Sequence, residues 1–405
     1  MTVATLSQRT IAVVTTSRAD YGHLYWPLKE LQAHREVNLP LIVAGAHLSP
    51  EFGLTVNEIE RDGFLIAERL ECLLSSDTDV GMAKTIGMAT MGFADIFGRL
   101  RPDLLLLIAD RYEILAPASA ALAMRIPIAH IEGGEVSEGA IDHAVRNAIT
   151  MMSHVHFAPT SLAARRIIAM GEEPWRVHEV GAPSLDHLRR SRLRSRKSIE
   201  AEMQISLDQT TIIVSYHPVT LERDTTTEAD AVFGALEEIQ QQIVFCFPNA
   251  DAGSRNLIQR ATRFCEVRSN AHLYVNLSHL IYWTLLKHAS LLYGNSSSGI
   301  METPSLGLPT VNIGKRQQGR ERATNIIDAE AEVEAILCAV QLALSEDFRA
   351  SLAGMTNPYG DGHAGERIAQ VLTQVPLDDR LLIKHARPIE PANAQVASNV
   401  VHPLA

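Results

Sequence analysis

The chain has 405 residues, 46% of them hydrophobic and 20% charged, so it can bury a large core and should form about two domains. A formal charge of −11 argues against a general nucleic-acid-binding protein, whose surface would be basic. The chain shows no signal-peptide pattern and no apolar run long enough to span a bilayer, and its four cysteines are widely spaced. We therefore expect a cytoplasmic protein that binds neither nucleic acid nor membrane.

Strand and helix patterns alternate along most of the chain. In the first half, apolar runs predict strands at 10–15, 39–44, 104–109, 126–131, 154–158 and 178–180. The second half repeats the plan, with predicted strands at 211–215, 242–247, 272–276, 290–293 and 310–313. These two series predict an α/β protein of two Rossmann-like, doubly wound domains, with the active site in the cleft between them.

The basic run RRSRLRSRK, at 189–197, separates the two series. We expect a first domain at 1–188 with the acid/base residues, a second, nucleotide-binding domain at 198–375, and a C-terminal extension at 376–405. The end of the extension is rich in Pro and Ala without a period, which predicts a mobile segment. The basic run could bind an anionic partner, but a solvated linker or helix face is the simpler explanation.

Charged side chains follow two apolar runs of the first half. Asp110 and Arg111 end the run LLLLIAD, and His130 and Glu132 end the run IPIAHIEGGE. Ligands of open α/β sheets bind beyond the carboxyl ends of the strands, so we expect these residues in the site.

The next helical segment adds a third acid, Asp142, and places Arg146 one turn later on the same face. Acids transfer protons and arginines hold anions. The pattern therefore indicates a negatively charged substrate that loses a proton.

Three residues at other strand ends suit parts of a nucleotide. Arg18 begins a helix, where a guanidinium and backbone N–H groups suit a phosphate, although Asp20 could simply cap that helix. His217, in SYHPVT, could donate to a phosphate oxygen or only pack within the fold. Asn249, in FPNADAGS, could recognise a base or ribose.

The segment GNSSSGIME, at 294–302, is the strongest of these signals. Ser296 and Ser297 lie between a strand and a helix, where hydroxyls and N–H groups suit a diphosphate. Glu302 could accept hydrogen bonds from two ribose hydroxyls, and Arg316 adds positive charge beyond the next strand. The alternative is a capped helix followed by an exposed loop.

Other chemistries lack their residue patterns. The loop after the first predicted strand lacks the GxGxxG fingerprint of dinucleotide-binding folds, and the sequence contains no P-loop and no GxSxG elbow. His154 and His156 have no partner at metal-site spacing, so we interpret them as strand histidines. We expect neither a metal nor a cofactor.

Nine motifs along the chain are similar, in order and spacing, to those of one enzyme family. They are TTSRADYGHL, ADRYE, HIEGGEVSEGAIDHAVRNAIT, VGAPSLD, SYHPVT, FPNADAGS, GNSSSGIME, GKRQQGRE and NPYGDGHAGERI. Over residues 10–375 the chain resembles hydrolysing UDP-N-acetylglucosamine 2-epimerases, both the bacterial sialic-acid-pathway enzyme and the epimerase half of the bifunctional epimerase/ManNAc kinase.

This resemblance implies a glycosyltransferase-B-like fold and conversion of UDP-GlcNAc and water to UDP and ManNAc without a metal or redox cofactor. In that reaction C2 loses a proton as UDP leaves C1, and water then adds to the resulting 2-acetamidoglucal. The acid/base candidates by resemblance are Asp110, Glu132 and Asp142, with Arg146 beside the last. The nucleotide-binding candidates are Arg18, Arg111, His217, Ser296, Ser297 and Arg316 at the diphosphate, with Asn249 and Glu302 at the nucleoside.

Two positions depart from the resemblance, because relatives often have HIHGGE for HIEGGE and Arg-His for Arg146-Asn147. Other substrates and activities therefore stay open. Close relatives act on UDP- or GDP-linked 2,4-diacetamido-2,4,6-trideoxyhexoses in legionaminic acid synthesis, and a non-hydrolysing epimerase would release no free UDP. A glycosyltransferase would leave C2 untouched, and a catalytically silent binding protein would not need three acids. The expected partners are a UDP-sugar substrate and further copies of the chain, as a dimer or tetramer.

Overall fold

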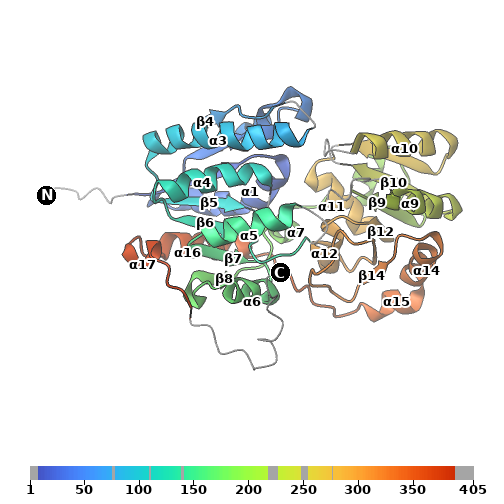
Figure 1. Cartoon of the computed structure of the whole chain (residues 1–405). Helices are drawn as coiled ribbons and strands as arrows, with labels where there is room; N and C mark the ends of the chain where they lie inside the picture. Colours follow the sequence, from blue (N-terminus) through green and yellow to red (C-terminus); the bar gives the residue numbers. More distant parts are fainter. Residues whose placement is uncertain are drawn as a thin grey trace, which may run out of the picture.

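The computed structural model describes residues 8–74, 78–108, 111–137, 141–217, 227–247, 254–275 and 277–387. It contains two parallel β-sheets, each flanked by helices, that lie side by side (Figure 1). This arrangement confirms the predicted α/β fold with two doubly wound units. Within the described ranges, no helix has both the length and the apolar character needed to cross a bilayer.

The first sheet has eight strands in the order β4-β3-β1-β5-β6-β7-β8, with β2 also pairing with β1. These strands are β1 (Arg9–Thr15), β2 (Val37–Asn38), β3 (Leu41–Ala44), β4 (Ile66–Leu70), β5 (Leu104–Ile108), β6 (Ile128–Ile131), β7 (Val155–Ala158) and β8 (Val177–Glu179). The helices that accompany them are α1 (Arg18–Ala33), α2 (Val56–Arg61), α3 (Asp79–Leu100), α4 (Leu115–Ala123), α5 (Asp142–Met152), α6 (Ser161–Ala169) and α7 (Ser184–Arg190).

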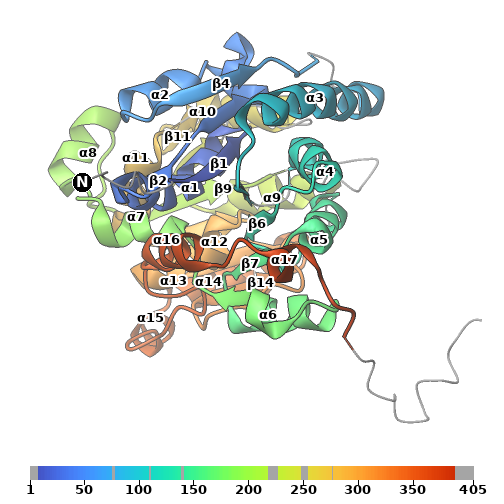
Figure 2. The same cartoon turned by 90° about the vertical axis from the view of Figure 1, so that its left-hand side faces the viewer.

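The apolar run of β5 is buried on both faces of the sheet. Leu104 and Leu106 point into a core shared with α1, whereas Leu105 and Leu107 point into a core shared with α3, α4 and α5. Figure 2 shows these two helical layers on opposite sides of the sheet. Such two-sided burial explains why the strand is a continuous apolar run.

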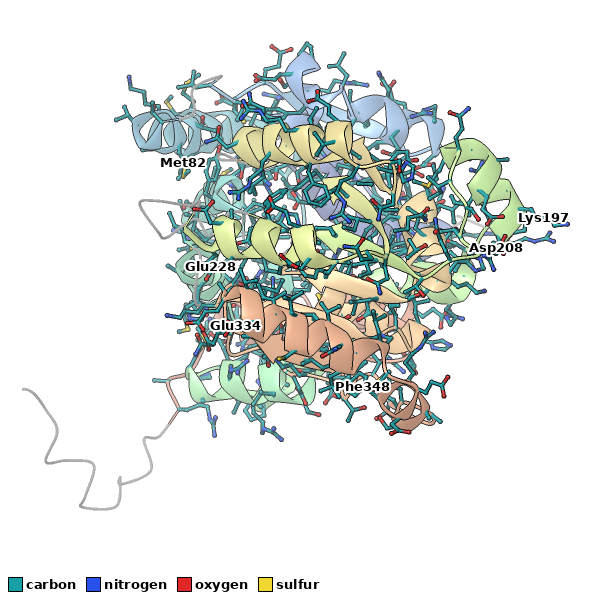
Figure 3. The ribbon with its side chains drawn as sticks, turned by 90° about the vertical axis from the view of Figure 1, so that its right-hand side faces the viewer. Met82, Lys197, Asp208, Glu228, Glu334 and Phe348 are labelled. Atoms are coloured by element: carbon teal, nitrogen blue, oxygen red, sulfur yellow. The ribbon has the colours of Figure 1, made fainter. Side chains whose placement is uncertain are left out.

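The second sheet has the order β11-β10-β9-β12-β13-β14. Its strands are β9 (Thr211–Ser215), β10 (Gln242–Phe247), β11 (Ala271–Val275), β12 (Leu291–Gly294), β13 (Thr310–Ile313) and β14 (Ile326–Ala329). The helices of the second half are α8 (Arg196–Met203), α9 (Thr227–Glu238), α10 (Ser254–Val267), α11 (His279–His288), α12 (Ser298–Met301), α13 (Thr303–Leu306), α14 (Val333–Leu344), α15 (Glu346–Ser351), α16 (Ala364–Gln374) and α17 (Asp379–Leu382). Figure 3 views this unit from outside, with Glu228 on α9, Glu334 on α14 and Phe348 on α15.

Helix α16 packs on the first unit, although the sequence placed it in the second domain, which was expected at 198–375. Its side chains Ile368 and Leu372 belong to the core that also contains Leu24 and Leu28 of α1. A Cβ atom added at Gly365 would lie only 3.0 Å from the α1 backbone. The strong apolar face of α16 predicts a packed helix but not which sheet it covers, and α1 supplies the matching surface.

Arg176, which is fully buried, holds the chain after α16 against the first unit through hydrogen bonds. Its guanidinium donates hydrogen bonds to the carbonyl oxygens of Arg380, Leu381 and Ile383 at 2.8, 2.7 and 2.9 Å. It also donates to the carbonyl of His154 at 3.1 Å. A single cation therefore satisfies the backbone of a returning segment whose carbonyls would otherwise lack partners.

Replacing Arg176 by methionine should lower the free energy of unfolding by about 3–5 kcal/mol, because several buried carbonyls lose their donor together. Denaturant titration of the variant against wild type measures the difference. The control is Arg165→Met, because Arg165 is exposed on α6 and its loss should change stability by less than about 0.5 kcal/mol. Equal stability of the two variants would show that the Arg176 hydrogen bonds to the segment after α16 do not stabilise the fold.

Candidate active site

Several of the predicted site residues follow the strands at which each sheet reverses its order. In the first sheet the order reverses between β1 and β5, which precede Arg18 and Arg111. In the second it reverses between β9 and β12, which precede His217 and Ser296. Crevices at such switch points are the usual ligand sites of open α/β sheets. Predicted site residues therefore follow the strands on both sides of each switch point.

Glu132 occupies an unusual backbone conformation directly after β6. Its φ of 66° lies in the left-handed region, which costs a residue with a side chain of order 1–3 kcal/mol. The backbone N–H of Glu132 donates to the carbonyl of Phe157 at 2.9 Å, which holds the turn against β7. The next turn is equally tight, because a Cβ at Gly134 would lie 2.3 Å from the carbonyl oxygen of Ala163. Strained backbone conformations of this kind cluster at functional sites.

The carboxylate of Glu132 is paired with His23, one turn and a half into α1. Their Oε1 and Nδ1 atoms are 2.7 Å apart. Burial disfavours the charged imidazole, but the Glu132 carboxylate outweighs it and raises the pKa of His23 to about 9. Burial also opposes charge on Glu132, yet His23, with Arg146 and Arg320, holds the pKa of this carboxyl below its usual value. Glu132 is therefore ionised at neutral pH.

The charge of His23 should stabilise the fold in a defined pH range. A pKa raised from about 6.5 in the unfolded chain to about 9 gives stability that is complete below about pH 6.5 and lost as the pH rises through 9. His23→Gln should therefore destabilise the protein more near pH 6 than near pH 10. Unfolding titrations at both pH values measure this, with His34→Gln at an exposed position as the control. A penalty that does not shrink at high pH would contradict the ion pair.

A second charged cluster joins the loop after β6 to the loop after β13. Arg320 lies 3.5 Å from the Glu135 carboxylate and donates to the Ser137 hydroxyl at 3.4 Å. Arg146 of α5, which is 2% exposed, donates to the same hydroxyl at 3.2 Å. The two arginines therefore meet at one hydroxyl, one from each half of the chain, beside Glu132.

Glu302 approaches the same cluster from the second sheet. It is buried, and this burial raises the pKa of its carboxyl. Its charge acts on His23 and on Glu132, so these three residues are close enough to influence one another. The cluster thus combines acids from both halves of the molecule.

The backbone of His217 and the side chain of Arg316 are both held by one buried residue, Asn295. The Asn295 side chain accepts from the His217 N–H at 2.7 Å and donates to the His217 carbonyl at 2.8 Å. The carbonyl of Asn295 in turn accepts from Arg316 at 3.0 Å. Two predicted diphosphate-binding residues are therefore fixed relative to each other by a residue of the GNSSSG segment.

The helix expected after β12 is interrupted in the structure. It forms two short helices, α12 and α13, of four residues each. Pro304 is at the start of α13 and cannot donate a backbone hydrogen bond, so the helix breaks at Glu302. Ser296 and Ser297 still precede α12, and the Ser296 hydroxyl accepts from the backbone N–H of Ser298 at 3.3 Å. Both serines therefore lie at the N-terminus of a helix of only four residues.

Arg18 and Arg111, which follow strands of the first sheet, each contact a defined partner. The Arg18 guanidinium donates to the carbonyl of Leu277, just before α11, and so connects the two halves. Arg111 is 3.0 Å from the buried Glu113. Asp20 accepts from the Thr16 hydroxyl at 2.6 Å and completes a capping box at the start of α1. It therefore caps the helix, which is the structural role that the sequence left open for it.

The remaining predicted residues fall into three groups. Asp142 is the first residue of α5 and is half-buried, one turn before Arg146. His130 is fully buried, with its Nδ1 atom 3.3 Å from the Thr150 hydroxyl, and its place in the site stays a prediction. Asp110 and Asn249 lie outside the described residues. Among the residues that are described, no cluster of three or more His, Cys, Asp or Glu could hold a metal.

His23, Asn295 and Arg320 belong to these clusters but were not singled out from the sequence. Each lies inside a motif that was recognised, TTSRADYGHL, GNSSSGIME or the basic run after β13. Position within those motifs is the only sequence signal for them, because their partners are far away in the chain. His23 and Glu132, for example, are separated by 109 residues.

Comparison with known proteins agrees with this architecture. A family model described as UDP-N-acetylglucosamine 2-epimerase matches residues 29–373. The UDP-GlcNAc 2-epimerase of Neisseria meningitidis, solved with UDP-GlcNAc bound, superposes with a TM-score of 0.78 at 19% identity, covering 90% of this chain and 100% of that one. Two Rossmann-ordered sheets arranged in this way define the glycosyltransferase-B-like fold class.

Three relatives are similar over most of their length. The UDP-N,N'-diacetylbacillosamine 2-epimerase (hydrolyzing) of Legionella pneumophila is 37% identical over 93% of this chain and 98% of its own. The GDP/UDP-N,N'-diacetylbacillosamine 2-epimerase (hydrolyzing) of Campylobacter jejuni is 37% identical over 80% and 85%. A UDP-N-acetylglucosamine 2-epimerase of Neisseria meningitidis is 31% identical over 83% and 87%. The chain is an enzyme of the UDP-N-acetylglucosamine 2-epimerase family.

Proposed function

We propose that this enzyme is a hydrolysing 2-epimerase for UDP-N,N'-diacetylbacillosamine, a UDP-linked 2,4-diacetamido-2,4,6-trideoxyhexose. The products are UDP and the free sugar inverted at C2. The observation that most supports this substrate is the 37% identity to two enzymes named for it, against 31% to an enzyme named for UDP-GlcNAc. The sequence alone favoured UDP-GlcNAc, and the relatives favour the alternative that was left open beside it.

The acid cluster suits the first chemical step. A base removes the C2 proton while the C1–O bond breaks and its electron pair leaves with UDP, which gives a 2-acetamidoglycal. Glu132, kept ionised by His23, fits a base or an electrostatic role at this step. In the second step water adds at C1 and an acid protonates C2 from the other face, for which Asp110 and Asp142 are our candidates.

The positive residues suit the leaving group. A departing diphosphate gains charge, and donors fixed before the reaction stabilise that charge best. Asn295 fixes both residues in this way, because its side-chain amide binds the His217 backbone and its backbone carbonyl accepts from Arg316. We assign Arg18, Arg111, Ser296 and Ser297 to the same diphosphate, with Asn249 and Glu302 at the nucleoside.

Incubation with a small substrate panel tests this proposal. UDP-N,N'-diacetylbacillosamine, its GDP analogue and UDP-GlcNAc are compared by the release of free nucleotide and by NMR of the sugar. We expect free UDP, a C2-epimerised sugar, and a kcat/KM for UDP-N,N'-diacetylbacillosamine at least about ten-fold above that for UDP-GlcNAc. Turnover in heavy water should place deuterium at C2.

Each other outcome has a distinct meaning. Preference for UDP-GlcNAc would show that the substrate is instead the one in the name of the 31% identical relative. An epimerised sugar still attached to UDP would show a non-hydrolysing epimerase. Retention of the original hydrogen at C2 would exclude the elimination route.

A further inference from the structure

Tyr359 lies between α15 and α16, in the segment by which the chain returns to the first unit. Its side chain is fully buried in a small core, and the other members of that core are Ala182, Leu185, Ile300 and Met301. The first two belong to the loop before α7 and to α7, and the last two belong to α12. The Tyr359 carbonyl also accepts from the N–H of Ala182 at 2.7 Å. Tyr359 is therefore fixed against both halves of the molecule.

The hydroxyl of Tyr359 reaches two loops that lead to the charged groups around Glu132. Its oxygen lies 3.2 Å from a carboxylate oxygen of Glu135, in the loop after β6, and 3.3 Å from the carbonyl oxygen of Glu321, in the loop after β13. Glu135 is only 2% exposed, and a buried carboxylate is costly unless donors or cations compensate its charge. The phenol is therefore one of the groups that stabilise a buried charge at Glu135.

Glu135 shares its second partner, Arg320, with a neighbouring hydroxyl. The Nε atom of Arg320 lies 3.5 Å from Oε2 of Glu135, the oxygen that also accepts from Tyr359. The Arg320 guanidinium donates to the Ser137 hydroxyl at 3.4 Å as well, where it meets Arg146. Within the described ranges, the other carboxylate oxygen of Glu135 forms no hydrogen bond. Without the phenol, Glu135 would therefore attract Arg320 more strongly and draw it away from Ser137.

Glu132 depends on the position of Arg320. Burial alone would raise the pKa of the Glu132 carboxyl, but three cations hold it below its usual value. They are His23 on α1, Arg146 on α5 and Arg320 after β13. Glu302, from the second unit, is the fourth titratable or charged group here, and its charge interacts with that of Glu132. Loss of Arg320 from this position would raise the pKa of Glu132 and protonate a larger share of it in mild acid.

We propose that Tyr359 is a positioning residue for the base of the reaction. Its hydroxyl satisfies Glu135, and Arg320 therefore stays beside Ser137 and Glu132 instead of pairing more closely with Glu135. The inference rests on the acid/base role proposed for Glu132, and it assigns Tyr359 no contact with the substrate. A residue of the segment that joins the two units thereby sets the charge around Glu132.

Removal of the hydroxyl alone tests this role. The measured quantity is the pH at which kcat/KM falls to half on the acid side, because this midpoint reports the pKa of the essential base in the free enzyme. The assay uses whichever nucleotide sugar of the substrate panel is turned over fastest. Tyr359→Phe and Arg320→Gln should each raise the midpoint by at least about 0.5 pH unit, because each removes Arg320 or its charge from Glu132. UDP affinity should change little in Tyr359→Phe.

A second change should reverse the effect. Tyr359→Phe combined with Glu135→Gln removes the charge that attracts Arg320, so the midpoint should return to the wild-type value or below it. Tyr274→Phe is the matched control, because it also removes a phenol hydrogen bond, in this case to the carbonyl of Met203 at the end of α8. Its midpoint should equal that of wild type. Melting temperatures of all the variants report on folding separately from the midpoint.

The outcomes separate this inference from the role of Glu132. An unshifted midpoint in Tyr359→Phe or Arg320→Gln, or a midpoint that stays raised in the double variant, would overturn the proposal, even where Glu132→Gln loses its turnover. A lower melting temperature of Tyr359→Phe without a shifted midpoint would show that the hydroxyl only stabilises the fold. Wild-type turnover in Glu132→Gln would instead overturn the acid/base assignment, and the proposal for Tyr359 with it.

Discussion

Glu132→Gln is expected to lower turnover by about 10²–10⁴-fold, the usual contribution of a general acid or base. The amide keeps the shape of the side chain but cannot accept a proton, and it also loses the charge that His23 stabilises at 2.7 Å. UDP affinity should change little, because the diphosphate is assigned to other residues. Steady-state kinetics and calorimetry with UDP measure the two quantities separately.

Asp110→Asn and Asp142→Asn should show the same pattern of slow turnover with retained UDP affinity. Glu36→Gln is the matched control, since Glu36 is exposed and distant from the crevice. Turnover within a few-fold of wild type for all three site variants would show that the acid/base site has been misplaced.

His217→Ala is expected to lower turnover by about 10²–10³-fold, because donors to developing charge contribute on the order of 2.7–4 kcal/mol to the transition state. The backbone of His217 is fixed by the Asn295 amide through two hydrogen bonds, at 2.7 and 2.8 Å. UDP binding in the ground state should weaken less than turnover. His272→Ala, on the edge strand β11, is the control histidine.

A purely structural histidine would give the opposite pattern. His217→Ala would then lower the melting temperature and leave the rate per folded molecule unchanged. Asn295→Ala adds a second test. Loss of the two hydrogen bonds from the Asn295 side chain to the His217 backbone should lower turnover, even though Asn295 is assigned no contact with the substrate. Unchanged turnover in that variant would contradict the positioning role.

The strands could be predicted where their residues are apolar on both faces. The predicted bounds of β9, β10 and β13 are those of the structure. Strands β2, β4 and β14 were missed. β2 has only two residues, and β4 (IAERL) and β14 (IIDA) are edge strands whose alternating or mixed exposure gives a weak signal.

The location of the site could be predicted better than its contacts. Polar residues after buried strands indicate the carboxyl edge of a sheet, and His217, Arg111 and Glu132 do follow such strands. Contacts between distant segments leave no periodic pattern. The His23–Glu132 pair and the contacts of Asn295 with His217 and Arg316 could therefore be identified only from the structure. His130 was included in the predicted site by strand-end position alone, and the structure shows that it is fully buried.

The return of α16 to the first unit means that the second unit is an insertion in the chain. It begins between α7 and α8 and ends between α15 and α16. A fragment that stops after α7 would expose the apolar side chains of α1 that α16 covers, and should aggregate. Grafting a nucleotide-binding unit from a relative would therefore require two junctions, one in each connection, with α16 and α17 kept from the original chain.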